Sequence, residues 1–295
     1  MAQKVLLIIN PVAGKTRGKA ALFPLTEAFC REGYEVTAFV TAKRGDAEQT
    51  ACERGAQHDL IVCCGGDGTL GEVINGVQAC GRTVPLGYIP LGSTNDFAST
   101  LGLPKRPADA IRRVLEGQDT PFDIGLWNGE RYFSYIASFG AFTASSYSAP
   151  QATKNVLGHL AYVLEGAKEL ANIHPYTVTV EADGRTINGE YLFGAVSNST
   201  TVGGMVKLDR SLVDLHDGEF EVVLVKPPKK AGDLSKLLLS LNSGKFDNKM
   251  FEFFKAKQVS FSIEGNPPWS LDGEQADGTA TVTVENRPGA LLLRL

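Results

Sequence analysis

The chain has 295 residues, more than one typical core requires and about right for two domains of ~100–200 residues each. Its residues are 43% hydrophobic and 21% charged and its net charge is −4, so bulk electrostatics do not favour nucleic-acid binding. No apolar run approaches the ~18–20 residues of a membrane span, and the N-terminal residues resemble a strand more than a signal peptide. The five cysteines form no C-x-x-C pair, which favours reduced thiols in a cytoplasm.

Strand and helix patterns alternate along the first 120 residues. Apolar or alternating runs predict strands at 5–10, 35–41, 60–64 and 85–91. Helical patterns lie between and after these runs, at about 19–31, 45–56, 69–79, 95–102 and 107–117. Such alternation indicates βαβ units and a parallel sheet.

After about Pro121 strand-like segments dominate, separated by turn dipeptides such as Asn128-Gly129 and Asp183-Gly184. Helical patterns interrupt them at 153–172 and 231–244. We therefore expect an α/β domain over 1–122 and a mostly antiparallel β-sandwich over 123–285. The last segment, about 286–295, can return to the first domain.

A glycine-rich turn follows the third predicted strand. Residues 66–71 match G-x-G-x-x-G between a strand and a helix, a pattern typical of dinucleotide sites. That class also needs an acidic residue about 20 positions further on, and the next strand has none. Asp67, inside the turn, would repel a phosphate unless a divalent cation lay between them. The turn therefore favours a nucleoside triphosphate with Mg²⁺, with a plain Asp-Gly turn as the alternative.

A second turn, "PLGSTNDFA", ends the next strand. Gly92 frees the backbone, Ser93 and Asn95 offer hydrogen-bonding groups, and Asp96 stands at a helix start. In open α/β sheets ligands bind at this carboxyl edge. The three acids Asp67, Asp96 and Asp123 would together form a magnesium–water cluster. The position of Asp96 is explained equally well if it is only the N-cap of a helix.

Five motifs occur in an order that resembles a known family: "NPVAGK", "TAKRGDAEQTA", "GGDGTLGEVING", "PLGSTNDFA" and "LDGE". Together they span almost the whole chain and resemble the soluble bacterial diacylglycerol kinase and lipid kinase family, related to sphingosine and ceramide kinases. "GGDGT" also occurs in NAD kinases and phosphofructokinases, whereas the "NDFA" turn and "DGE" together are more specific to this family. The resemblance implies an NAD kinase-like first domain and transfer of the γ-phosphoryl group of ATP to a lipid hydroxyl, with diacylglycerol giving phosphatidic acid.

The resemblance also implies roles for particular residues. Glu274 would be the general base that takes the proton of the lipid hydroxyl, with Asp272 supporting it, in a cleft between the domains. Asp67, Asp96 and Asp123 would hold the catalytic Mg²⁺ through waters. The implied nucleotide contacts are Asn10, Pro11, Gly14, Thr41, Gly65, Gly66, Asp67, Gly68, Thr69, Glu72, Gly92, Ser93 and Asn95.

A second, structural Mg²⁺ is implied at "LVDLHDGEF", held by the backbone carbonyls of Asp214 and Glu219 and the side chain of Asp217. Two positions depart from the family pattern. Ser93 stands in the place of a threonine, and Gly71 replaces an asparagine of the glycine turn.

Residues 226–257 carry eight lysines among several aromatic residues, a composition suited to an anionic membrane surface. The alternative is a solvated basic helix with its phenylalanines in the core. We expect a cytoplasmic enzyme that contacts the inner face of the membrane transiently and binds a lipid substrate but no nucleic acid. Dimerisation, the identity of the lipid, an NAD kinase and a non-catalytic nucleotide or lipid sensor all remain open.

Overall fold

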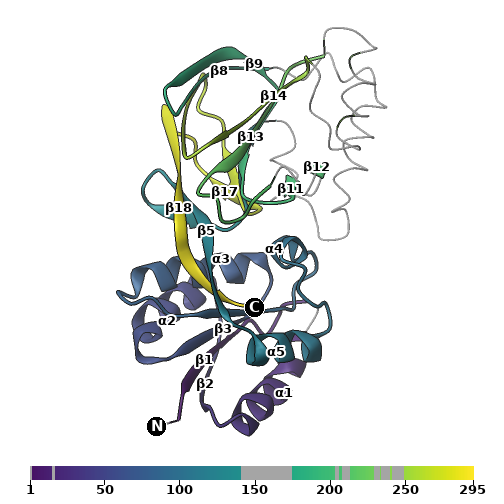
Figure 1. Cartoon of the computed structure of the whole chain (residues 1–295), viewed down its shortest axis with the longest axis vertical. Coiled ribbons are helices and arrows are strands. Elements are labelled where there is room, and N and C mark those ends of the chain that lie inside the picture. The colour runs from purple at the N-terminus through teal and green to yellow at the C-terminus, as the bar shows by residue number, and fades with distance from the viewer. Residues whose placement is uncertain are drawn as a thin grey trace. The chain divides into compact units, whose positions relative to one another are not determined.

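The computed structural model describes residues 2–14, 17–140, 175–202, 206–207, 213–228, 233, 240 and 249–295. The chain divides into two units, each described by itself (Figure 1). Unit 1 comprises Met1–Ile124 and Pro288–Leu295, and unit 2 comprises Gly125–Arg287. The predicted helix at 153–172 lies outside the described residues, as does nearly all of that at 231–244.

Strands and helices alternate in unit 1, as predicted. The strands β1 (Lys4–Ile9), β2 (Glu35–Val40), β3 (Leu60–Gly65) and β4 (Leu86–Pro90) form a parallel sheet in the order β2-β1-β3-β4. The helices are α1 (Arg17–Arg31), α2 (Asp46–Arg54), α3 (Asp67–Ala79), α4 (Asp96–Thr100) and α5 (Pro107–Glu116), and a 3₁₀ turn, η1 (Gly55–Gln57), follows α2.

Side-chain alternation along β1 explains how the helices are layered on this sheet. Residues 5–9 are all buried, as expected for a strand covered on both faces. Val5, Leu7 and Ile9 pack in one core with residues of α1 and α5, so Leu6 and Ile8 face the opposite side. Figure 1 shows α1 and α5 on one face of the sheet, with α2 and α3 on the other.

One long strand runs from unit 2 into unit 1. β18 (Thr281–Arg294) runs through Pro288 and Gly289, residues that normally mark a break. Its first half pairs with a strand of unit 2, and near its end Leu293 pairs with Leu86 of β4. The backbone N–H of Gly289 donates to the Asp123 carboxylate at 2.7 Å. Pro288 lies between the stretch that pairs with β15 and the residue that pairs with β4, so neither of these ladders needs the N–H that proline lacks.

Unit 2 consists of antiparallel strands, which confirms the predicted β-sandwich. One sheet has the order β14-β13-β10-β7-β16-β17, and β15, β8 and β9 extend from β18 in a second layer. β5 (Asp119–Trp127) enters this unit and pairs with β6. The remaining bounds are β6 (Arg131–Phe133), β7 (Ile136–Gly140), β8 (Tyr176–Ala182), β9 (Arg185–Tyr191), β10 (Phe193–Ser197), β11 (Thr201–Val202), β12 (Val206–Lys207), β13 (Phe220–Val225), β14 (Phe251–Ala256), β15 (Gln258–Ile263), β16 (Trp269–Leu271) and β17 (Glu274–Ala276).

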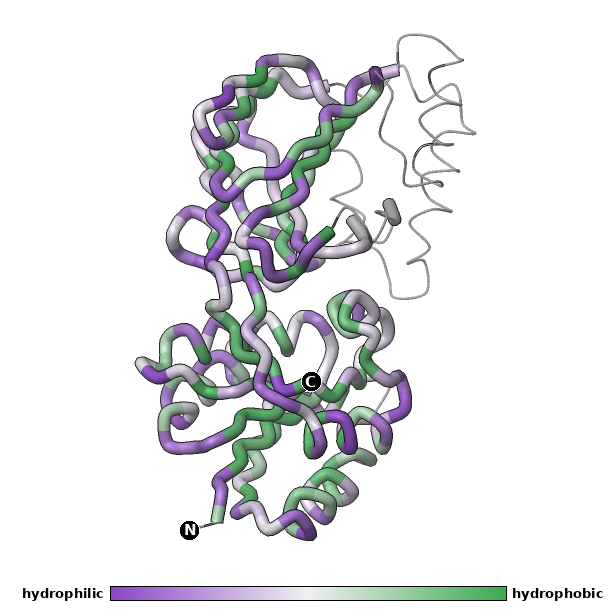
Figure 2. Tube along the Cα trace, in the orientation of Figure 1, coloured by the Kyte–Doolittle hydropathy of each residue, from purple (hydrophilic) through white to green (hydrophobic). Residues whose placement is uncertain are grey.

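Aromatic side chains join the two layers of unit 2. The ring of Phe139 lies 5.0 Å from that of Trp269 and 5.7 Å from that of Phe261, between centroids. All three side chains are almost fully buried. In Figure 2 the strands of unit 2 carry both hydrophobic and hydrophilic residues. Among the described residues, no helix is long and apolar enough to cross a bilayer.

Candidate active site

The two glycine turns at the carboxyl ends of β3 and β4 are in backbone contact. The carbonyl oxygen of Gly65 accepts the N–H groups of Leu91 at 2.8 Å and Gly92 at 3.2 Å. A Cβ atom placed on Gly92 would lie 2.7 Å from the Cα atom of Gly66 and 2.6 Å from Oδ1 of Asn95. Only glycine therefore allows the turns to approach this closely.

We expect Gly92→Ala to lower the free energy of unfolding by about 1–3 kcal/mol, because the added methyl group forces the turns apart. Chemical denaturation monitored by circular dichroism measures this change. The matched control is Gly71→Ala, since a Cβ atom there meets nothing within 4 Å. Equal stabilities of the two variants would show that the close approach is unimportant.

Asp67 bridges the two turns through its carboxylate. It is the first residue of α3, and its Oδ2 and Oδ1 atoms accept the N–H groups of Asp96 at 3.1 Å and Phe97 at 3.4 Å. Asp67 therefore caps α4, whose own N-cap residue, Asn95, supplies no side-chain cap. The predicted acids Asp67 and Asp96 lie next to each other, and the N-cap suggested for Asp96 comes from Asp67 instead.

Asn95 and Tyr88 hold the second turn in shape. Asn95 has a left-handed backbone, with φ of 53°, and its Nδ2 atom donates to the Gly92 carbonyl at 2.8 Å. The Tyr88 hydroxyl lies 3.3 Å from Asn95 Oδ1, and burial, followed by the nearby Asp67 carboxylate, raises the pKa of Tyr88. The phenol thus stays a neutral donor. Sequence analysis missed Tyr88, although a tyrosine in a buried strand generally needs a polar partner.

The loops after β1 and β2 join the same edge of the sheet. Asn10 donates from Nδ2 to Thr69 Oγ1 at 3.0 Å, and its Oδ1 atom accepts the N–H of Val12 at 3.1 Å. Thr41 donates its N–H to the Ile9 carbonyl at 2.9 Å. The same strand ends and helix starts carry the remaining predicted nucleotide residues, Pro11, Gly14, Gly65, Gly68 and Ser93.

Glu72 caps a neighbouring helix, a role that the sequence did not indicate. Its two carboxylate oxygens accept the N–H groups of Gly45 at 2.9 Å and Ala47 at 3.2 Å. These groups begin α2, where Gly45 has a φ of 85°. Glu72 therefore caps α2 and fixes the loop after β2. A contact between Glu72 and a nucleotide remains a prediction.

Asp123 lies in β5 and is only 2% exposed, with Oδ1 bound to the Gly289 N–H. Among the described residues, no three acidic, histidine or cysteine side chains converge closely enough to ligate a metal directly. Asp67 and Asp96 nevertheless supply neighbouring oxygen donors, the class that Mg²⁺ prefers. The donors fit a cation held through water, and the part played by Asp123 remains a prediction.

Asp272 anchors the hairpin between β16 and β17. Its carboxylate accepts the backbone N–H groups of Ser134, Tyr135 and Ile136 and the hydroxyl of Ser134. Desolvation raises the pKa of Asp272, and these hydrogen bonds partly oppose the rise. Asp272 and Gly273 both have positive φ, at 51° and 85°, as a tight hairpin requires. The turn that presents Glu274 is therefore fixed to the segment before β7.

Glu274 is the first residue of β17 and forms an ion pair with Arg131. Its Oε2 atom lies 2.9 Å from Nη2 of Arg131, and both side chains are partly exposed. The two residues are 143 positions apart, so no local pattern could have pointed to Arg131.

The segment 213–219 contains the predicted structural metal residues. Asp214 Oδ1 accepts the His216 N–H at 3.1 Å, and Asp217 Oδ1 accepts the Glu219 N–H at 3.0 Å. Each contact is a local turn of the Asx type. Farther along the chain, burial raises the pKa of Glu221 to about 7, with the Lys255 ammonium opposing the rise.

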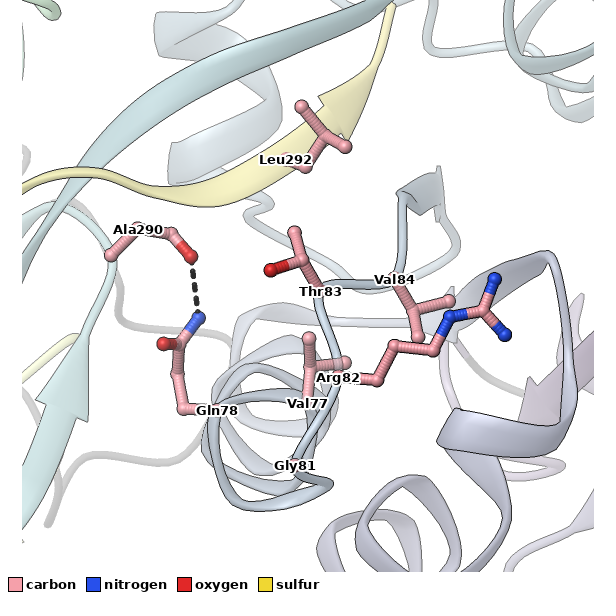
Figure 3. A pocket seen from close by; sticks show the side chains of 8 residues that line it. All are labelled: Val77, Gln78, Gly81, Arg82, Thr83, Val84, Ala290 and Leu292. Carbon is pink, nitrogen blue, oxygen red and sulfur yellow. Dashed lines mark hydrogen bonds between the residues drawn. The ribbon is translucent and has the colours of Figure 1, made fainter.

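A pocket of about 230 Å³ lies at the other edge of the unit 1 sheet, where β4 begins. In Figure 3 the Gln78 amide points to the carbonyl of Ala290, to which it donates at 2.8 Å. No predicted site residue lines this pocket, so it is separate from the candidate active site. Its lining comprises Val77, Gln78, Gly81, Arg82, Thr83, Val84, Ala290 and Leu292.

Family models match both parts of the chain. The diacylglycerol kinase catalytic domain matches residues 4–127, and the YegS C-terminal NAD kinase beta sandwich-like domain matches residues 137–294. The diacylglycerol kinase of Bacillus subtilis (strain 168) is 35% identical over 276 residues, covering 92% of this chain and 90% of that protein. That of Staphylococcus saprophyticus is 32% identical, covering 93% and 90%.

Solved structures agree with this result. A crystal structure from Bacillus anthracis str. Sterne, described as a candidate diacylglycerol kinase, has a TM-score of 0.81 and 27% sequence identity. It covers 99% of this chain, and this chain covers 95% of it.

The matched catalytic domain and the curated relatives show a kinase, a phosphotransferase, built from an α/β domain with paired glycine turns and an antiparallel β-sandwich. The chain belongs to the diacylglycerol kinase family. The family, fold class and enzyme class predicted from the sequence are thereby confirmed.

Proposed function

We propose that the chain transfers the γ-phosphoryl group of ATP to the free hydroxyl of diacylglycerol, giving phosphatidic acid and ADP. The bond from the γ-phosphorus to the β–γ bridging oxygen breaks, a bond to the lipid oxygen forms, and the hydroxyl proton leaves. The observation that carries the proposal is the Asp67 carboxylate bound across the two glycine turns, in a chain whose relatives are named diacylglycerol kinase.

The start of α3 is suited to the phosphates of ATP. Its N-cap residue, Gly66, has an extended backbone and no side-chain cap, so backbone N–H groups of the first turn can meet an anion. Gly92 packs against Gly66 without a side chain between them, and Gly66, Asp67 and Gly68 are partly exposed, so a phosphate could reach the turn. A nucleotide bound here would lie beside Asp67 and Asp96.

A bound Mg²⁺ would remove the electrostatic repulsion between these carboxylates and the triphosphate. Asp67 and Asp96, with Asp123, would hold the ion through water molecules, and the bound ion would neutralise negative charge on the phosphates. Asp67 additionally keeps α4 in place through its cap.

Glu274 would accept the proton of the lipid hydroxyl. Asp272 fixes the hairpin on which Glu274 stands, and Arg131 pairs with its Oε2 atom. A carboxylate in a fixed position is the type of group that phosphoryl transfer requires for a hydroxyl acceptor.

The test is transfer of label from γ-labelled ATP with Mg²⁺ to diacylglycerol in mixed micelles. Parallel reactions contain phosphatidylglycerol, a sphingoid base, an undecaprenol-like alcohol, NAD or no acceptor. Labelled phosphatidic acid as the dominant product is the expected result. Label found mainly on NAD would favour an NAD kinase, and ATP hydrolysis without any labelled acceptor would contradict the proposal.

We also propose a cytoplasmic enzyme that contacts the membrane transiently through part of the lysine-rich region. Lys226 pairs with Glu252 and Lys255 with Asp217, which leaves Lys249 and Lys257 as the exposed described lysines of the region, and Lys249 is chosen for the test. We expect Lys249→Glu to weaken cosedimentation with anionic vesicles and to leave binding to neutral vesicles unchanged. Lys4→Glu, an exposed lysine of unit 1, is the control. Unchanged cosedimentation of Lys249→Glu would argue against contact through this lysine.

A further inference from the structure

A lysine side chain, Lys255, supplies a positive charge at the turn before β13. Nζ of Lys255 lies 2.6 Å from Oδ2 of Asp217 and 3.3 Å from Oε1 of Glu221. The Glu221 side chain is 0% exposed, whereas that of Lys255 is 32% exposed. One ammonium group is therefore shared by two carboxylates, one of them fully buried.

Strand register places this lysine. β13 and β14 pair antiparallel, with Glu221 directly opposite Lys255, and Phe220 and Val222 opposite Ala256 and Phe254. Directly opposed residues have Cβ atoms ~4.5–5.5 Å apart on the same face of the sheet. The pairing of Lys255 with Glu221 thus follows from the ladder and not from a chance orientation of a surface side chain.

The buried carboxylate depends on that lysine. Apart from the ion pair with Lys255, Glu221 Oε1 and Oε2 have no hydrogen-bond partner among the described residues. A buried carboxylate that loses its cation is strongly destabilising. Lys255 therefore neutralises the buried Glu221 carboxylate and also binds Asp217 in the turn before β13.

The resemblance to lipid kinases assigns a structural Mg²⁺ to this same turn, with the Asp217 carboxylate as a ligand. Oδ1 of Asp217 already accepts the Glu219 N–H, and Oδ2 already binds the Lys255 ammonium. A divalent cation on this carboxylate would face a positive charge only a few ångströms away, which repels it. The side chains as arranged do not fit an additional cation.

We propose that Lys255 supplies the positive charge at residues 213–219 in place of a structural metal ion, so that the folding of unit 2 does not require divalent cations. The inference is independent of the proposed lipid kinase activity, because it concerns folding in the absence of nucleotide.

Thermal unfolding of the full chain by circular dichroism, in excess EDTA and in excess Mg²⁺ without nucleotide, tests this inference. We expect the same Tm for the wild type in both solutions. Lys255→Met should lower the Tm in EDTA by several degrees or prevent folding, whereas Lys255→Arg, which keeps the charge, should retain most of the stability.

Two results would overturn the inference. One is a wild-type Tm that rises with Mg²⁺ and loses this rise in Asp217→Asn. The other is a Lys255→Met variant that melts in EDTA at the wild-type Tm.

Discussion

Glu274→Gln is expected to lower kcat for phosphorylation of diacylglycerol by about 10²–10⁴-fold while KM for ATP stays near the wild-type value. Glutamine preserves the size of the side chain but cannot take a proton from the lipid hydroxyl. The interaction is needed only when the proton is transferred, so the loss should fall on kcat. Steady-state kinetics with labelled ATP and diacylglycerol micelles measure both constants.

The matched control for this variant is Glu285→Gln. Glu285 is also a partly exposed glutamate of unit 2 paired with an arginine, Arg287, at 3.3 Å. Its exchange should leave both kinetic constants unchanged. A Glu274→Gln variant with normal kcat and a raised KM would show that this glutamate binds substrate and does not act as the base.

Asp67→Asn is expected to lower kcat/KM for ATP by at least about 100-fold, which corresponds to roughly 2.7 kcal/mol of lost transition-state stabilisation. The charge that would hold the cation is lost. One carboxylate oxygen that accepts an α4 N–H is also replaced, so unfolding should become easier by about 0.5–2 kcal/mol. Kinetics and chemical denaturation of the same preparation separate these two effects.

Asp46→Asn provides the comparison for Asp67→Asn. Oδ2 of Asp46 accepts the N–H groups of Ala42 at 2.7 Å and Lys43 at 2.9 Å, so Asp46, the first residue of α2, fixes the loop that precedes this helix. Its exchange should lower stability and leave kcat/KM near normal. If Asp67→Asn kept as much activity as Asp46→Asn, Asp67 would be a helix cap and nothing more.

Periodicity explains why the fold could be predicted. Residues 5–9 and 60–65 form continuous apolar runs that end in polar or glycine-rich turns, and helical patterns separate them. Parallel strands place their carboxyl ends at one edge, which brought Asp67 and Asp96 together in the prediction and in the structure.

Contacts between residues far apart in sequence could not be predicted in this way. Glu72 caps a helix that begins 25 to 27 residues earlier in the chain, and Lys255 binds Asp217 across 38 residues. Arg131 binds Glu274, which lies 143 residues further along the chain. The local sequence around Glu72, Lys255 and Arg131 does not distinguish them from other charged residues. Strand register or turn geometry brings each of them to its partner.

The local chemistry of a turn was also ambiguous from sequence. An aspartate after glycine at a helix start indicates either a cap or a phosphate-site acid, and Asp67 makes cap hydrogen bonds to a helix other than its own. β18 also runs through Pro288 and Gly289, residues that normally mark a break, and these two lie between the stretches that pair with β15 and with β4.

Calorimetric titration of ATP into the wild type and into Asp67→Asn, each with Mg²⁺ and with EDTA, tests the central claim most directly. The account predicts that Mg²⁺ strengthens ATP binding to the wild type by at least about 10-fold, or 1.4 kcal/mol, and that Asp67→Asn loses this gain. Equal affinity of the wild type for ATP with and without Mg²⁺ would contradict it.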